Sequence, residues 1–381
     1  MTMVGRLPII LSVMFTIKRC GVIEKMKFLR EKPSLIQATA RRKGKRSRLL
    51  WSSLLVMSLL ILSACGQNSS NSAKIEEGKV NVVTTFYPVY AFTAAIGGED
   101  ANVINLLPTG VEPHDWTPKS QDIVNTSKAQ LFLYNGAGLE GWVPNFLKSL
   151  DSDSKVKAVA VSDGVDLLMA EGDDGHDHGA EQSEEHAHED EHADEHTNDA
   201  GSEEVDSHHI DPHTWVSPKS ALIMAENIKN SLVEADPAHK EGYEQRYKAL
   251  QTKLAALDQR FTDELSKVPN KEIVVSHQAF GYLARDYGLT QHAIMGLSPD
   301  AEPTGQDIVN LSKLVKEEGI KYIFFEELVS DKLAKTLAGE AGVETMVLNP
   351  VEGLTKEQAA SGDDYFTLME KNLQNLLIAL K

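Results

Sequence analysis

Short runs of β-branched and apolar residues alternate with helical patterns in two separate stretches of the chain. The strand-like runs lie at 80–86, 103–107, 131–134 and 156–161 in the first stretch, and at 273–276, 322–325 and 345–348 in the second. The helical patterns lie at 87–96, 119–127, 218–234, 278–287, 306–318, 331–341 and 364–380. Because parallel strands need a crossover connection, usually a helix, this order predicts parallel βαβ units. Each stretch is therefore expected to form an α/β lobe around a central parallel sheet.

A single long helical pattern separates the two stretches. It covers 237–268 and carries apolar residues near helical spacing, namely Tyr243, Tyr247, Leu250, Leu254 and Leu257. A helix of this length, at about 1.5 Å per residue, reaches across a whole domain. We therefore expect two α/β lobes, at 79–236 and 269–381, joined by one linking helix. Ligands of open α/β sheets bind beyond the carboxyl ends of the strands, so we expect a site in the cleft between the lobes.

A basic segment, an apolar segment and small residues follow one another near the amino terminus. Residues 41–48 are strongly basic and residues 49–62 are apolar, and Ser63, Ala64 and Cys65 follow. This order is typical of a secretory signal, and the apolar run is short for a membrane span.

Leu62-Ser63-Ala64-Cys65 resembles a bacterial lipobox. The resemblance implies that Cys65 becomes the lipidated first residue of the mature protein, held at the outer face of the cell membrane. We therefore expect a signal region at 1–64, with Met26 as a candidate true start, and a flexible tether at 65–78. The alternative is an uncleaved membrane anchor that ends in an incidental cysteine.

An acidic, histidine-rich segment interrupts the first lobe. Residues 171–206 contain sixteen Asp or Glu and no Lys or Arg, and residues 171–209 contain eight His. The segment lacks aromatic residues, so we expect a disordered insertion that collects metal, with a solvated acidic spacer as the alternative.

The whole chain carries a formal charge of −18 and has no basic stripe after residue 65. Such a surface favours cations and argues against nucleic-acid binding.

Three histidines outside this insertion lie in loops or at strand ends, where a ligand site is expected. His114 and His213 share the pattern Pro-His-x-Trp, and His277 follows the strand-like run at 273–276. Proline stiffens the backbone before the ligand, and neutral imidazoles suit Zn²⁺, Cu²⁺ or Ni²⁺ better than Ca²⁺ or Mg²⁺. Three imidazoles and a carboxylate complete a tetrahedron. His239 is expected to be exposed, whereas His292 is a further candidate near the site.

Four segments together resemble the zinc-specific receptors of bacterial ABC importers, the ZnuA type. They are Thr84-Thr85-Phe86-Tyr87-Pro88, Pro113-His114-Asp115-Trp116, Asp211-Pro212-His213-Thr214-Trp215 and Ser276-His277-Gln278-Ala279-Phe280-Gly281-Tyr282. The resemblance covers residues 78–381. It implies two lobes, a rigid linking helix and a cleft metal bound by His114, His213 and His277. It also implies zinc, because manganese receptors of this fold carry a carboxylate at the third position.

Glu352 is the predicted fourth ligand, with Glu326 and a water molecule as alternatives. Glu352 lies in the loop after the strand-like run at 345–348, where the resembling receptors place their carboxylate ligand. Glu326, after the run at 322–325, is the competitor. Glu112 or Asp115 is expected to soften the charge of the ion or to orient a histidine.

The chain is therefore expected to be a zinc receptor that delivers Zn²⁺ to the permease of an ABC importer. We expect a monomer without enzymatic activity, in which release follows loop motion around His213 or Glu352 rather than wide lobe opening. A zinc hydrolase is the first alternative, although the sequence contains no HExxH motif. A metal-buffering surface adhesin is the second.

Overall fold

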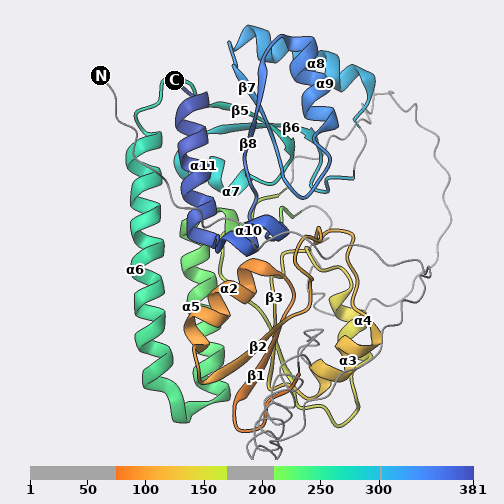
Figure 1. Ribbon diagram of the computed structural model, residues 1–381, viewed down its shortest axis with the longest axis vertical. Helices are drawn as coiled ribbons and strands as arrows, with labels where there is room; N and C mark the ends of the chain where they lie inside the picture. Colours follow the sequence, from red (N-terminus) through yellow and green to blue (C-terminus); the bar gives the residue numbers. More distant parts are fainter. Residues whose placement is uncertain (1–73, 170–209, 301–302) are drawn as a thin grey trace, which may run out of the picture. The chain divides into compact units, whose positions relative to one another are not determined.

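The computed structural model describes residues 74–169, 210–300 and 303–381, which belong to one compact unit (Figure 1). The predicted signal region 1–64, the lipidated Cys65 and the insertion 171–209 lie outside the described residues. Residues 74–78, the end of the predicted tether, contact the first lobe, where Asn81 Nδ2 donates to the Glu76 carbonyl at 2.9 Å. Within the described ranges, no helix is both long and apolar enough to cross a bilayer.

The first lobe is a four-stranded parallel sheet in the order β2-β1-β3-β4. Its strands are β1 (Val80–Thr84), β2 (Ala101–Asn105), β3 (Leu131–Tyr134) and β4 (Lys157–Ala160). The connecting helices are α2 (Tyr87–Gly97), α3 (Ser120–Ser127) and α4 (Val143–Lys148). Every residue of β1 is buried, as expected for a central strand with both faces covered. The short helix α4 was not predicted.

The second lobe repeats this arrangement with the strand order β6-β5-β7-β8. Its strands are β5 (Glu272–His277), β6 (Thr290–Met295), β7 (Tyr322–Phe325) and β8 (Glu344–Val347). Its helices are α7 (Gly281–Tyr287), α8 (Gly305–Glu317), α9 (Lys332–Ala341), α10 (Lys356–Ser361) and α11 (Tyr365–Ala379). The edge strand β6 was missed, because only its last two residues are buried and its first three are polar.

Two antiparallel helices connect the lobes, and the longer one confirms the linking helix. Helix α5 (Pro218–Ala235) leads to a 3₁₀ turn at Pro237–His239, and α6 (Lys240–Leu265) follows. Figure 1 shows α6 running beside α5 and α11, and it also contacts α2 and α7. One core of buried apolar side chains therefore continues from the first sheet along α6 to the second sheet.

Candidate metal centre

Three imidazoles and one carboxylate converge where the two lobes meet. The Nε2 atoms of His114 and His213 lie 3.2 Å apart, and those of His213 and His277 lie 3.3 Å apart. Glu352 Oε1 lies 3.5, 3.4 and 3.6 Å from the Nε2 atoms of His114, His213 and His277. A tetrahedron with zinc–ligand bonds of about 2.0–2.1 Å has edges of about 3.3 Å. These five distances therefore match the edges of a zinc tetrahedron, and all four donor atoms lie within 4.8 Å of one another.

The carboxylate of this group is not satisfied by the protein. Glu352 follows β8 and is 2% exposed, and its Oε1 has no hydrogen-bond partner. Burial alone raises the pKa of Glu352, but the three histidines hold it well below its usual range. An ionised, buried acceptor without a donor is costly, and a cation between the four side chains supplies the missing partner.

His213 is oriented by a carboxylate two residues before it. Asp211 Oδ1 accepts from the His213 backbone N–H at 3.0 Å and lies 2.8 Å from Nδ1. When Nδ1–H donates to Asp211, the lone pair of Nε2 faces the centre of the group. Burial alone lowers the pKa of His213, but the hydrogen bond with Asp211 and the nearby carboxylate of Glu352 raise it.

The loop that carries His213 is bonded to both lobes. Asn135, at the end of β3, donates from Nδ2 to the Pro212 carbonyl at 2.8 Å, and its Oδ1 accepts from Thr214 Oγ1 at 3.1 Å. From the second lobe, the Tyr282 hydroxyl donates to the Asp211 carbonyl at 2.7 Å. These bonds fix the backbone on both sides of the ligand.

His277 ends β5 and is oriented by Glu326, which follows β7. Glu326 Oε1 lies 2.6 Å from His277 Nδ1 and also accepts from the Ser276 hydroxyl. Glu326 therefore contacts the far side of the ring, and Glu352 rather than Glu326 joins the four-residue group. Burial alone lowers the pKa of His277, but the charge of Glu326, its hydrogen bond with Nδ1 and the nearby carboxylate of Glu352 raise it to about 10.

His114 lies in the loop between β2 and α3, and its neighbouring acid holds the backbone. Glu112 Oε1 and Oε2 accept from the His114 backbone N–H at 2.9 and 3.0 Å. The prediction that Glu112 orients a histidine ring is thus replaced by a backbone role. The side chain of His114 is 10% exposed, whereas those of His213 and His277 are fully buried. The centre is therefore closest to solvent at His114.

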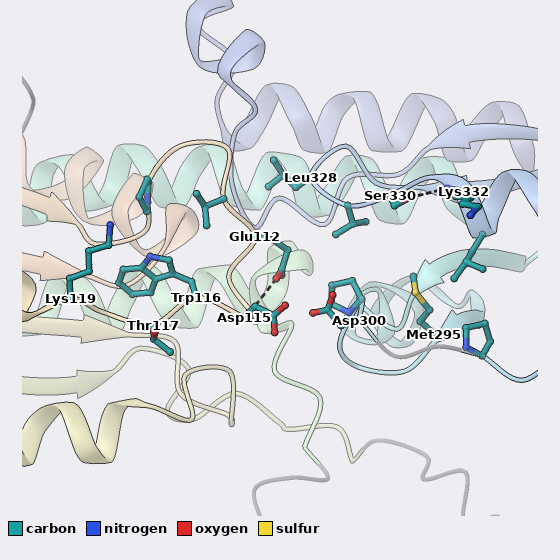
Figure 2. Close-up of a pocket in the computed structure, with 16 residues that line it drawn as sticks. Glu112, Asp115, Trp116, Thr117, Lys119, Met295, Asp300, Leu328, Ser330 and Lys332 are labelled. Atoms are coloured by element: carbon teal, nitrogen blue, oxygen red, sulfur yellow. Dashed lines mark hydrogen bonds between the residues drawn. The ribbon is translucent and has the colours of Figure 1, made fainter.

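A cavity of about 1050 Å³ lies beside the His114 loop, between loops of the two lobes. Figure 2 shows the carboxylates of Glu112 and Asp115, from the first lobe, facing Asp300 of the second. One oxygen of each lies within 4.8 Å of the others. The cavity therefore has an acidic wall that attracts cations.

The remaining histidines of the described residues lie outside the centre. His292, on β6, pairs with Glu272 at 2.6 Å and is not part of the group. His239 is half-exposed and pairs with Asp236 at 2.7 Å. The orienting role of Asp211 was missed, although its position two residues before a candidate ligand is the kind of spacing that signals it.

The fold and the site define a class of protein with two helix-linked α/β lobes and a His₃Glu centre between them. The chain belongs to the ZnuA family, described as zinc-uptake complex component A, periplasmic, whose model matches residues 82–379. This confirms the resemblance and the fold inferred from the sequence.

Relatives with known names cover most of the chain. It is 44% identical over 323 residues to the zinc-binding protein AdcA of Streptococcus pyogenes, covering 85% of this chain and 60% of that protein. It is 42% identical over 329 residues to the high-affinity zinc uptake system protein ZnuA of Bacillus subtilis, covering 86% and 96%. The Zn(II)-bound ZnuA-like domain of Streptococcus pneumoniae AdcA matches with a TM-score of 0.63 and 39% identity, covering 80% and 99%. The chain thus spans 60% of the length of the streptococcal relative and nearly all of the Bacillus one.

Proposed function

We propose that this chain is an extracytoplasmic receptor that binds Zn²⁺ and delivers it to an ABC-type importer. The observation that carries the proposal is the buried group of His114, His213, His277 and Glu352, whose donor atoms lie at the edge length of a zinc tetrahedron. Imidazoles suit zinc better than they suit calcium or magnesium. Relatives named for zinc binding and zinc uptake support the same cargo.

The route to the membrane is proposed from the sequence and from one relative. Cys65, after the apolar run, is the proposed lipid attachment site, and the zinc-binding lipoprotein AdcA of Streptococcus pneumoniae is 42% identical over 330 residues. A monomer anchored in this way stays at the outer face of the membrane beside the permease. The histidine-rich insertion 171–209 is proposed to collect zinc for the receptor.

A hydrolase is disfavoured by the ligand count. Catalytic zinc sites keep a coordination position open for water, whereas four protein donors already stand at tetrahedral separation here. The discriminating observation is the shell of the bound ion: four protein ligands support the receptor, and a water beside a free carboxylate supports the hydrolase.

Zinc titration of the metal-stripped protein, with a competing chelator, tests the receptor. We expect one tight site, its loss in His277→Ala, and its retention in His292→Ala, the matched histidine outside the centre. Deletion of residues 173–207 is expected to lower the total zinc bound while the tight site remains. A tight site that survives His277→Ala would refute the assignment.

A further inference from the structure

The residue before Glu352 has a backbone conformation that its side chain opposes. Val351 has φ = 60°, one of two non-glycine residues with positive φ in the described ranges, and it is fully buried. A β-branched side chain in this left-handed region is a true outlier, which persists only when the surroundings impose it. The structure must therefore hold this segment in place.

Side-chain hydrogen bonds to the backbone impose the conformation. Asn372, on α11, accepts at Oδ1 from the Asn349 N–H at 2.8 Å and donates from Nδ2 to the Asn349 carbonyl at 2.6 Å. The side chain of Asn349 in turn accepts from the Val351 N–H at 2.7 Å. Both asparagines are buried, at 1% and 5% exposure, so water cannot replace these bonds.

A further bond ties the same segment to the loop of another ligand. Trp215 donates from Nε1 to the Pro350 carbonyl at 2.7 Å, and Trp215 lies two residues after His213. The backbone is thus held at three consecutive residues, 349 to 351, and the next residue is the carboxylate of the centre. The fixed backbone sets the point from which Glu352 extends, and the burial of its side chain restricts the positions that the carboxylate can take.

A carboxylate held in one position limits the coordination number that the site can offer to an ion. Glu352 directs one oxygen, Oε1, at the three Nε2 atoms, and Asp211 and Glu326 hold two of the rings from behind. Zn²⁺ is satisfied by four such donors, whereas Mn²⁺ prefers six, mostly oxygens. An ion that seeks six ligands needs the carboxylate to shift toward two-oxygen binding or the loop to admit water.

We propose that Asn372 is a positioning residue for Glu352, acting through Asn349 and the strained Val351. It keeps Glu352 in a position from which a single carboxylate oxygen serves as the fourth ligand. The site therefore favours four-coordinate ions over six-coordinate ions. The inference rests on the proposed function, since it assumes that the four-residue group binds the transported ion. Asn372 thus contributes to ion selectivity although it is not one of the four ligands.

The test compares Asn372→Ala and Val351→Gly with the native full chain. Asn372→Ala removes both bonds to Asn349, and Val351→Gly widens the range of backbone conformations open to the residue before Glu352, so the segment is held less firmly. Asn227→Ala is the matched control, because Asn227 Nδ2 also donates to two backbone carbonyls, of Val161 and Asp163, away from the centre. Zn²⁺ and Mn²⁺ affinities are measured by chelator competition, and Co²⁺ absorption reports the coordination number.

In Asn372→Ala we expect zinc affinity to fall about 10- to 100-fold, as for other residues that support metal ligands. Manganese affinity should fall much less, so the preference for zinc narrows by about tenfold or more. The intense Co²⁺ bands of a tetrahedral site should weaken, Val351→Gly should change in the same direction by less, and Asn227→Ala should match the native protein.

An unchanged Zn²⁺ to Mn²⁺ ratio and unchanged Co²⁺ bands in folded Asn372→Ala and Val351→Gly would overturn the positioning role. If Asn372→Ala does not fold, Val351→Gly decides alone. Failure of the native protein itself to bind zinc tightly would instead overturn the proposed function, so the two failures are distinguishable.

Discussion

Replacing Glu326 by Gln tests how the protein prepares His277 for a metal ion. Glu326 and Glu352 together raise the pKa of His277 to about 10, although burial alone lowers it. At pH 7.5 a group with this pKa is almost fully protonated, whereas a histidine with the ordinary pKa of about 6.5 holds roughly one tenth of a proton. Zinc needs the neutral ring, so its binding must release about one proton from His277 in the native protein.

The sign of the pH dependence follows from the same pKa. Because the proton competes with the ion, the apparent zinc affinity of the native protein should rise by about tenfold per pH unit from His277 alone, until the pH approaches 10. Glu326→Gln removes the nearest negative charge while an amide oxygen remains to accept from Nδ1–H. We expect this variant to release most of one proton less than the native protein at pH 7.5, with a flatter pH dependence.

Titration calorimetry in buffers of different ionisation enthalpy counts the released protons. The matched control is Glu272→Gln, since Glu272 lies 2.6 Å from His292 Nε2 in an equivalent pair outside the centre. Its proton release should equal that of the native protein. Equal release by Glu326→Gln and the native protein, with zinc still bound, would show that Glu326 does not hold the proton on His277.

Three further predictions concern stability, access and metal removal. Arg246→Ala should lower the free energy of unfolding by about 2 kcal/mol in urea titrations and leave zinc affinity unchanged. The reason is that the Arg246 guanidinium donates to the last two carbonyls of α2 and to the Asp100 carboxylate, at 2.6 to 2.9 Å. Asp115→Asn combined with Asp300→Asn should slow zinc association in stopped-flow experiments at low salt, and the difference should shrink as salt increases. Chelating the bound metal should lower the melting temperature, and zinc at about 100 times its Kd should restore about 2.7 kcal/mol in the native protein but nothing in His277→Ala.

The parts of the fold that the sequence predicted are those with strong local signals. The buried strands β1, β3, β5 and β7 are apolar or β-branched throughout much of their length, and their predicted positions are confirmed. Strand β6 gave no such signal, because an edge strand exposes its first residues and can carry Thr290, Gln291 and His292. Helices α4 and α10 have six residues each, too few for a periodic pattern to appear.

The histidines of the centre were predictable from local motifs, whereas Glu352 was predicted only through the family resemblance and the orienting roles of Asp211 and Glu326 were not predicted. His114, His213 and His277 each stand in a short motif whose chemistry is local. Glu326 and Glu352 both follow a parallel strand of the same sheet, so the local pattern does not separate them, and Glu352 was favoured only through the resemblance to zinc receptors. Only the packing places Glu326 beside Nδ1 of His277 and Glu352 among the three Nε2 atoms. The positive φ of Val351 could not be predicted from the sequence either, because nothing in the segment Asn349-Pro350-Val351 requires it.

The distribution of the ligands over both lobes explains why the linking helix matters. His114 belongs to the first lobe, and His277 and Glu352 to the second, so a wide hinge would disperse the centre. The apolar core continues along α6 through both lobes, and Trp215 bonds the His213 loop to the Glu352 loop directly. These contacts restrict the loops that carry the donor atoms, so little ordering is expected to oppose binding. The same bonds mean that movement of the His213 loop must also disturb the Glu352 loop, so the predicted release by loop motion involves both loops together.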